Sequence, residues 1–299
     1  MGADTAGYQK FYKVTAQTSW EYIFDLWEFE PGFVIFEKLL SYISASPMFF
    51  QFVYTTVYLV CIVYFANQQE HSPFLFLYFF ATLGLYTFMF TGVRQCLAMC
   101  ICLCSYRFIQ ERKLLPFLIL VALAFVFHKS SIVFAASYFI YSRKLKYWNI
   151  ILYVLIAIVF LLDIEFFHGW FNDQLDFDYS LEQTGNGFIY LMVMAVITVC
   201  GLLSIKQQTQ DNSNMIGIFN ISLIALLFWI LRLRTRTAER MSYYFLFYSM
   251  ALLSNSIFEF KKREEKIAIG IMAIVFSMLL YIYRFITNLS SMVPYKLGF

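Results

Sequence analysis

Long apolar stretches follow one another along most of this chain. An α-helix rises about 1.5 Å per residue, so roughly 20 residues cross a hydrocarbon layer of about 30 Å. Transmembrane β-strands would instead alternate in and out, and residues 150–162 show no such alternation. The pattern therefore predicts an all-α, polytopic integral membrane protein. The clearest predicted spans are residues 48–66, 73–90, 148–167, 188–205, 215–231, 243–258 and 267–287.

Residues 91–141 break this pattern into shorter apolar pieces. Basic residues flank 114–141, and because Lys and Arg mark the cytoplasmic side, both ends of this stretch should lie inside. Two short antiparallel helices fit the stretch better than one span, with their apex at residues 128–131, His-Lys-Ser-Ser. Ionisable residues at the tips of half-length helices are tolerated only beside protein or a water-filled cavity.

The composition excludes a soluble protein and a nucleic-acid partner. Of the 299 residues, 61% are hydrophobic and 14% charged, whereas soluble domains are about half apolar and a quarter charged. The formal net charge of +3 is too small to favour nucleic acid. We predict one transmembrane domain over residues 1–299, with about 9–11 membrane helices including short or broken ones. The cysteines lie in apolar segments without evident further ligands nearby, so no metal site is expected.

The charge pattern orients the predicted spans. Basic turns at Arg107, Arg143 and Lys261 belong inside, and the acidic loop 168–187 and the segment 1–47 belong outside or at the outer interface. Alternation of the spans then brings a group of arginines to the outer face, against the orientation rule. These are Arg232, Arg234, Arg236 and Arg240. Either the topology differs here, or the arginines bind an external anion such as phosphate, whose oxygens match guanidinium groups.

Arg94 and His128 should converge with this group on one outward-opening cavity, and both stand in short motifs. Residues 91–98 read Thr-Gly-Val-Arg-Gln-Cys-Leu-Ala, and residues 127–131 read Phe-His-Lys-Ser-Ser. In this order and spacing they resemble the central signature of the EpsG family, bacterial inner-membrane proteins of exopolysaccharide and capsule synthesis regarded as Wzy-type polymerases. Further matching positions are Gly2, Asp4 and Tyr8, then Glu30, Gly32 and Phe33, and finally Arg240, Tyr243 and Tyr244.

The resemblance implies transfer of a growing glycan from undecaprenyl diphosphate onto another lipid-linked repeat unit of exopolysaccharide, capsule or O-antigen. It implies a site facing outside the bacterial cytoplasmic membrane, lipid-linked oligosaccharide and membrane lipid as partners, and no cofactor. Flippase and chain-length regulator proteins are further expected partners, and the fold would resemble GT-C-like membrane glycosyltransferases. Family members usually carry a span before the Gly-x-Asp element, so we expect the recorded start to be internal.

Roles follow for the candidate residues. His128 is the expected base or diphosphate hydrogen-bond donor because His titrates near neutral pH, and Asp4 is a second candidate base. Arg94 would assist the other arginines in neutralising the charge of the leaving diphosphate. The other cationic candidates would bind the diphosphate: Arg232, Arg234, Arg236, Arg240 and Lys129. The aromatic candidates for sugar binding are Tyr243, Tyr244 and Trp170, together with Trp20 and Trp27. Interfacial anchoring is the alternative role for the tryptophans.

Other functions stay open at this point. A flippase or other transporter would bind diphosphate through the same arginines without chemistry, although no internal repeat is visible. A membrane acyltransferase would also use a membrane His, but it predicts a donor site open to the cytoplasm. A ligase that attaches the polymer to another acceptor is almost indistinguishable from a polymerase by sequence.

Overall fold

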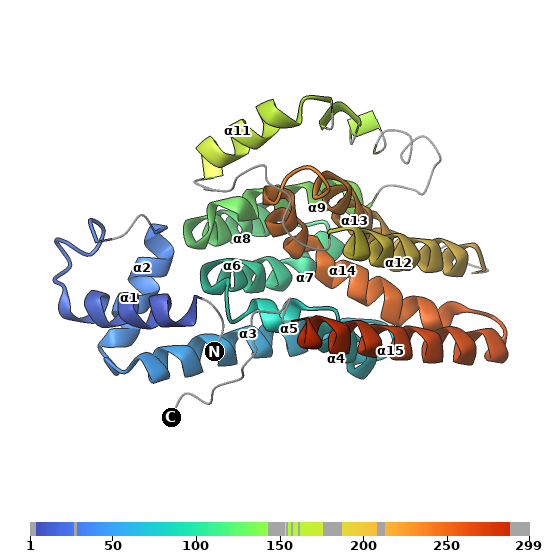
Figure 1. Ribbon diagram of the computed structural model, residues 1–299, viewed down its shortest axis with the longest axis horizontal. Coiled ribbons are helices and arrows are strands. Elements are labelled where there is room, and N and C mark those ends of the chain that lie inside the picture. Colours follow the sequence, from blue (N-terminus) through green and yellow to red (C-terminus); the bar gives the residue numbers. More distant parts are fainter. Residues whose placement is uncertain are drawn as a thin grey trace.

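The computed structural model describes residues 4–26, 29–142, 153, 155–156, 158–160, 162–175, 187–207 and 213–287. Within these ranges the regular structure is helical throughout (Figure 1). Four described helices, α3, α12, α13 and α15, are long and apolar enough to cross a membrane. The predicted all-α, polytopic membrane class is thereby confirmed. The predicted span 148–167 lies mostly outside the described residues.

The described helices range from short pieces such as α5, with four residues, to α15, with 24 residues. They are α1 (Thr5–Gln17), α2 (Pro31–Ser41), α3 (Pro47–Ala66), α4 (Pro73–Thr82), α5 (Leu85–Phe88), α6 (Val93–Cys104), α7 (Tyr106–Gln110), α8 (Leu114–Phe127), the 3₁₀ helix η1 (Lys129–Ala135), α9 (Ala136–Tyr141), α11 (Ile164–Leu175), α12 (Gly187–Gln207), α13 (Ser213–Leu231), α14 (Thr237–Glu259) and α15 (Arg263–Ile286).

Helix α14 forms the centre of the bundle. Most of its side chains are buried, and α4, α12, α13 and α15 pack around it. Small hydroxyl side chains let neighbouring helices come close and pair across the contacts. The hydroxyls of Ser249 and Ser222 lie 2.8 Å apart, and Ser204 donates to Ser256 at 3.2 Å. The predicted span 243–258 is thus a buried central helix rather than a lipid-facing one.

Gly84 divides the predicted span 73–90 into two helices. Its φ of 104° lies in the left-handed region that side chains other than glycine rarely adopt. Helix α4 therefore ends at Thr82, and the short α5 starts after the glycine. The prediction of one continuous span was wrong here. Hydropathy alone does not reveal the break, because a single glycine barely changes the mean over such a stretch.

Residues 114–141 form the predicted pair of short antiparallel helices. Helix α8 ends at Phe127, His128 is extended with φ −161° and ψ 116°, and η1 and α9 lead back. The open ends of this hairpin meet, because Arg112 Nη1 donates to Tyr138 O at 2.6 Å and the Tyr138 hydroxyl donates to Arg112 O at 2.7 Å. His128 therefore stands at the closed end of the hairpin, away from Arg112.

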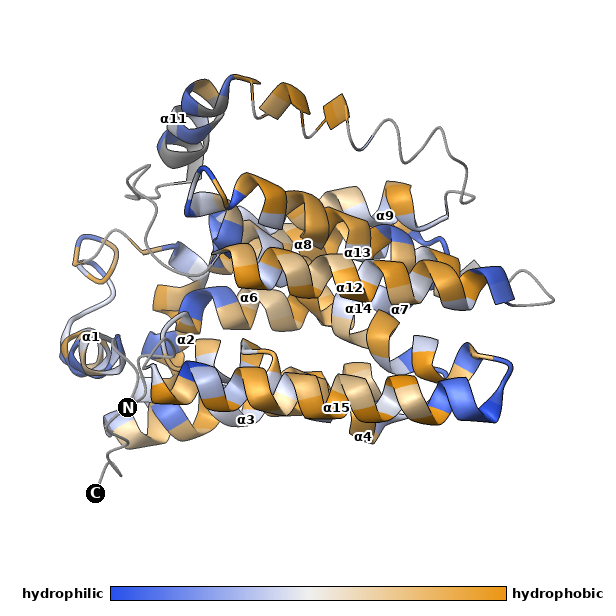
Figure 2. Cartoon of the chain, turned by 45° about the vertical axis from the view of Figure 1, so that its right-hand side comes forward, coloured by the Kyte–Doolittle hydropathy of each residue, from blue (hydrophilic) through white to orange (hydrophobic). Residues whose placement is uncertain are grey.

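The helices carry polar residues at the two ends of the bundle. Figure 2 shows hydrophobic residues along the middle of the long helices and hydrophilic residues at the start of α15 and the end of α12. At that end the Lys261 N–H donates to Gln207 Oε1 at 3.0 Å. The opposite end carries the starts of α6 and α14, where Gln95 Nε2 donates to Arg240 O. An apolar belt between two polar ends is the arrangement that a bilayer requires.

Helices α1 and α2 pack at the end of the bundle where α6 begins. Buried aromatic rings join them to α3: Tyr12 stacks on Phe50 with centroids 4.8 Å apart, and Phe33 lies 6.2 Å from Phe50. Lys38 Nζ donates to Thr18 O at 2.7 Å and to two further carbonyls at the end of α1. A cation at this place satisfies carbonyls that the helix end leaves unpaired.

Gly32 lets α2 touch the backbone of α8. Pro31 occupies the first turn of α2, and Glu30 before it is extended with ψ 140°, as residues before proline prefer. A Cβ on Gly32 would lie 2.8 Å from Val126 O and 2.9 Å from Val126 Cγ1. This close approach brings the start of α2 to the closed end of the α8–η1 hairpin.

Replacing Gly32 by alanine should destabilise the protein, because the added methyl group collides with backbone atoms of α8. Overpacking of this kind costs about 1–3 kcal/mol, which corresponds to a fall of roughly 5 °C in unfolding temperature. The measurement is thermal unfolding in detergent, followed with a thiol-reactive fluorophore that detects the buried cysteines. Gly7→Ala is the matched control, since its nearest neighbour would be 3.7 Å away. Equal unfolding temperatures for the two variants would contradict the close contact.

Glu37 is a buried carboxyl group on α2. Its side chain is inaccessible to solvent, and Thr15 Oγ1 donates to its Oε2 at 3.4 Å. Burial raises the pKa of Glu37 from 4.5 to about 8. Between these values the folded protein holds a proton that the unfolded chain releases, so the free energy of unfolding falls as the pH rises through this range.

Glu37→Gln should therefore raise the unfolding temperature at alkaline pH and change it little in mild acid, where the wild-type carboxyl is protonated. Each pKa unit is worth about 1.4 kcal/mol, so a gain of at least about 5 °C is expected above pH ~8. Thermal unfolding at two pH values measures this. The exposed Glu21→Gln is the control and should give no such difference. A Glu37→Gln variant less stable than wild type at both pH values would mean that Glu37 is ionised.

Candidate functional site

Glu30, Arg94 and His128 form a continuous polar chain where α2, α6 and the α8–η1 hairpin meet. Arg94 Nη1 lies 2.5 Å from Glu30 Oε2, and His128 Nδ1 lies 2.7 Å from Glu30 Oε1. The backbone N–H of Lys129 also donates to Glu30 Oε1, at 3.2 Å. One carboxylate thus joins three segments that are far apart in the sequence.

Each member of this chain stands at the end of a helix. Glu30 precedes the first residue of α2, Arg94 is in the first turn of α6, and His128 follows the last residue of α8. Helix ends leave backbone N–H groups without helical partners. The extended conformation of His128 places the Lys129 N–H, at the start of η1, against the carboxylate. Breaks in the helices therefore create the polar surroundings of Glu30.

Burial and pairing set the protonation of this group. Burial alone raises the pKa of the Glu30 carboxyl, but the hydrogen bond from His128 and the positive charge of Arg94 outweigh it and hold that pKa well below its usual 4.5. Burial lowers the pKa of His128 below its usual 6.5, against the raising effect of Glu30. Glu30 is thus ionised at neutral pH, and His128 is a neutral imidazole that donates through Nδ1. In this tautomer the ring lone pair lies on Nε2.

Several buried polar atoms close to this chain have no hydrogen-bond partner within the described residues. They are Arg94 Nε and Gln95 Oε1 on α6 and Ser131 Oγ on η1, two helices that pack against each other. Gln95 Nε2 donates to Arg240 O at 2.5 Å, which joins the start of α6 to α14. Buried polar groups are nearly always paired, so these donors and acceptors are available to a ligand or to water.

Aromatic rings lie beside the cationic residues. Arg94 Cζ is 4.3 Å from the ring centroid of Phe29, and Arg240 Cζ is 5.0 Å from that of Phe88. The ring of Phe88 in turn lies 4.3 Å from the ring of Tyr243. A ring face stabilises a guanidinium group through its quadrupole. Such a contact positions the charge without consuming a hydrogen-bond donor.

The four predicted diphosphate-binding arginines differ in burial and in pairing. Arg232 is buried and its Nε donates to Glu239 Oε2 at 2.6 Å, so its charge is balanced within the protein. Arg234 and Arg236 are exposed. Arg240 is half-buried on the first turn of α14, close enough to His128 to affect its electrostatic environment together with Arg94. The structure thus brings Arg240, Arg94 and His128 together, as expected for a shared site.

The two predicted tyrosines pack behind this group. The Tyr243 hydroxyl donates to Glu239 Oε1 at 2.6 Å, so one carboxylate receives both Arg232 and Tyr243. The hydroxyl of Tyr244 lies 2.9 Å from Ser130 Oγ, and the Tyr244 side chain is buried. Both hydroxyls therefore stabilise the elements that carry Arg240 and His128.

The remaining candidates lie at the surface. Asp4 is exposed directly before α1 and makes no side-chain capping bond. Trp170 on α11 is 50% exposed, which leaves a ring face accessible. Trp20 is also exposed, and its Nε1 donates to the Tyr42 hydroxyl at 2.7 Å. Trp27 lies outside the described residues.

Sequence reasoning did not connect Glu30 with the site. It is visible as part of an acidic segment and of a Glu-Pro-Gly-Phe stretch, but it is 64 residues from Arg94 and 98 from His128. No periodicity relates positions so far apart. The available signal was chemical, because an arginine at the end of an apolar helix needs a counter-charge. Glu239, one residue before Arg240, was overlooked for the same reason.

Glu70, His71 and Glu259 form a separate cluster at the other end of α14. One ligand atom from each lies within 4.8 Å of the others, as a divalent metal would require. His71 Nε2 is already 2.7 Å from Glu259 Oε1, and both side chains are partly exposed. A hydrogen bond between His71 and Glu259 accounts for this arrangement, which is remote from Arg94 and His128.

Comparisons with known proteins agree with the motifs around Arg94 and His128. The sequence model of the EpsG family matches residues 1–297, nearly the whole chain. No curated protein and no solved structure matches the chain. The resemblance inferred from short motifs is confirmed by this match, which extends over helices and connections alike. This protein therefore belongs to the EpsG family.

Proposed function

We propose that this protein polymerises lipid-linked oligosaccharide repeat units. It transfers a growing glycan from undecaprenyl diphosphate onto a sugar hydroxyl of another lipid-linked unit, at the outer face of the bacterial cytoplasmic membrane. Family membership fits a polysaccharide repeat-unit polymerase. The observation that supports the proposal is the Glu30–Arg94–His128 chain beside Arg240, in which an imidazole and two guanidinium groups lie at one end of the helices.

His128 acts as the base in the proposed reaction. The acceptor hydroxyl gives its proton to Nε2 while its oxygen bonds to the anomeric carbon of the donor glycan. The bond between that carbon and the diphosphate oxygen breaks, and its electron pair leaves with the diphosphate. Glu30 orients the imidazole through Nδ1 and stabilises the imidazolium that forms, because an anion 2.7 Å away favours the charged ring.

Arg94 and Arg240 neutralise the leaving diphosphate. Negative charge grows on the leaving oxygen as the glycosidic bond breaks, and preorganised cations aimed at such an oxygen are often the largest catalytic effect. Guanidinium groups supply this charge without a metal ion. The buried and unpaired Arg94 Nε supports an anion-binding role for this side chain. Arg232, which pairs with Glu239, instead holds the turn before α14.

The surface candidates receive the substrates in this proposal. Exposed Arg234 and Arg236 make the first contacts with the lipid diphosphate, and the exposed ring of Trp170 stacks on sugar. No cofactor is required, because the diphosphate is itself the leaving group. Flippase and chain-length regulator proteins are the proposed protein partners.

His128→Ala, Arg94→Ala and Glu30→Gln should each leave single lipid-linked repeat units where the wild type makes polymer. Loss of a general base lowers the rate about 10²–10⁴-fold, and Glu30→Gln removes the anion that holds both partners. The measurement is the length of the lipid-linked glycan in a strain that lacks the protein and is complemented with each variant. Membrane levels are checked by immunoblot.

His71→Ala is the matched control for these variants. His71 makes an equally short contact with a carboxylate, Glu259, at the opposite end of α14, so its removal should leave full-length polymer. Full-length polymer from His128→Ala and Arg94→Ala at normal membrane levels would reject the site. Repeat units held at the inner face in these variants would indicate transport instead of polymerisation.

The loss of polymerisation activity at acid pH should reflect protonation of His128. Because the pKa of His128 lies below 6.5, polymerisation by purified protein in liposomes should persist at that pH and fall about tenfold per pH unit below the pKa. Glu30→Gln removes an anion that raises this pKa, so the residual activity should decline at a lower pH than in wild type. His71→Ala should keep the wild-type profile. An acid decline of the wild type above pH 6.5, or a shift to higher pH in Glu30→Gln, would exclude this assignment.

A further inference from the structure

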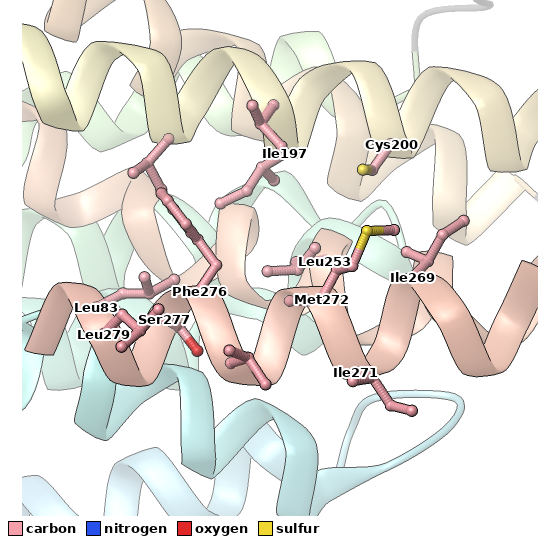
Figure 3. Close-up of a pocket in the computed structure, with 14 residues that line it drawn as sticks. Leu83, Ile197, Cys200, Leu253, Ile269, Ile271, Met272, Phe276, Ser277 and Leu279 are labelled. Carbon is pink, nitrogen blue, oxygen red and sulfur yellow. The ribbon is translucent and has the colours of Figure 1, made fainter.

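An apolar groove lies between α12 and α15, with α14 as its floor (Figure 3). Ile197 and Cys200 line it from α12, Leu253 from α14, and Met272 and Phe276 from α15. Its volume of about 600 Å³ falls within the range of roughly 300–1,000 Å³ typical of ligand sites. The lining is almost entirely hydrocarbon, so the groove suits an apolar chain.

The groove follows the middle of the membrane helices. Residues 269–279 of α15 border it, and about ten helical steps of 1.5 Å correspond to about 15 Å, half the thickness of the hydrocarbon layer. Ser277, a polar residue in this lining, donates its hydroxyl to Ile274 O at 3.1 Å and needs no partner from a ligand. An occupant therefore lies alongside α15 and makes apolar contacts.

Arg284 lies beside the Leu83 end of this groove and is not one of its lining residues. Leu83, which lines the groove, precedes Gly84, and a Cβ on Gly84 would lie 2.2 Å from Arg284 Nη1. This Nη1 is buried and has no hydrogen-bond partner among the described residues, while Nη2 donates to Thr87 Oγ1 at 3.5 Å. The ring centroid of Tyr190 lies 5.3 Å from Arg284 Cζ. The apolar groove thus ends beside a cation with an unused donor.

Helix α5 joins this cation to the candidate site. Thr87, which contacts Arg284, precedes Phe88, whose ring packs 4.3 Å from Tyr243 and 5.0 Å from Arg240 Cζ. Arg284 lies in the last turn of α15, on the side of the bundle where α14 begins. The groove therefore leads from the middle of the membrane toward the end that carries Glu30, Arg94 and His128.

We propose that this groove binds the isoprenoid tail of a polyprenyl diphosphate and that Arg284 pairs with its phosphate oxygens. The inference rests on the proposed function and names where the lipid-linked substrate is held. Charge complementarity selects this occupant, because hydrocarbon matches the lining and an anion matches the unpaired Nη1. A neutral hydrocarbon chain fills the groove but leaves the guanidinium group unpaired.

Photo-crosslinking of the full-length protein in nanodiscs tests the groove directly. The probe is undecaprenyl diphosphate with a diazirine in its tail. It should label the peptide with residues 269–279, and unlabelled undecaprenyl diphosphate should compete, whereas the same excess of phosphatidylglycerol should not. Ala273→Phe, which fills the groove, and Arg284→Gln should each lower labelling about tenfold. Val196→Phe fills the groove from the α12 wall and replaces Ala273→Phe if that variant misfolds.

Ala268→Phe is the matched control, because it makes the same change at an exposed position of α15 outside the groove. The probe should label this variant as strongly as it labels the wild type. Equal competition by phosphatidylglycerol would make the groove a contact for bulk lipid and overturn the inference. Normal labelling of both groove-filling variants would overturn it while leaving the polymerase intact. Specific labelling by a wild-type protein that makes no polymer would instead reject the proposed function alone.

Discussion

The ionised carboxylate of Glu30 holds one end of this protein together. Arg94 pairs with one of its oxygens, and both His128 and the Lys129 N–H donate to the other. Removing one partner of a buried ion pair typically costs about 3–5 kcal/mol, because an uncompensated charge is left behind. The same contact that attaches the N-terminal helices to the bundle therefore also sets the protonation of the candidate base. Stability and chemistry depend here on one side chain.

Interrupted helices make such a site possible in a membrane protein. A continuous helix satisfies its own backbone and turns its side chains toward lipid or neighbouring helices. Here α8 ends at Phe127 and α6 begins at Val93, and the polar side chains at these two helix ends meet where other helices surround them. Two glycines enable this arrangement: Gly84 adopts the conformation that ends α4, and Gly32 allows α2 to approach α8. The buried α14 supplies the common support for these short pieces.

The arginines at this end differ in their surroundings, and the surroundings separate their roles. Arg232 is balanced by Glu239, which leaves it little capacity to attract an external anion. Arg240 and Arg284 lie against the aromatic rings of Phe88 and Tyr190. Cations gathered at one end repel one another, so an anionic ligand that contacts several of them relieves this repulsion. A lipid diphosphate carries negative charge that can pair with the arginines and a hydrocarbon tail that fits the apolar groove.

The sequence by itself determined the helical membrane class and the hairpin apex at residues 128–131, and it singled out Arg94 and His128 as candidate site residues. Span length, apolar composition and basic flanks are local properties, and they are readable along the chain. It did not determine the break at Gly84, the neutralisation of Arg232 or the place of Glu30. Tertiary structure alone decided which ionisable residues meet. Ion pairing depends on distance in space, and the contact of Gly32 with Val126 brings Glu30 to His128 across 98 residues of sequence.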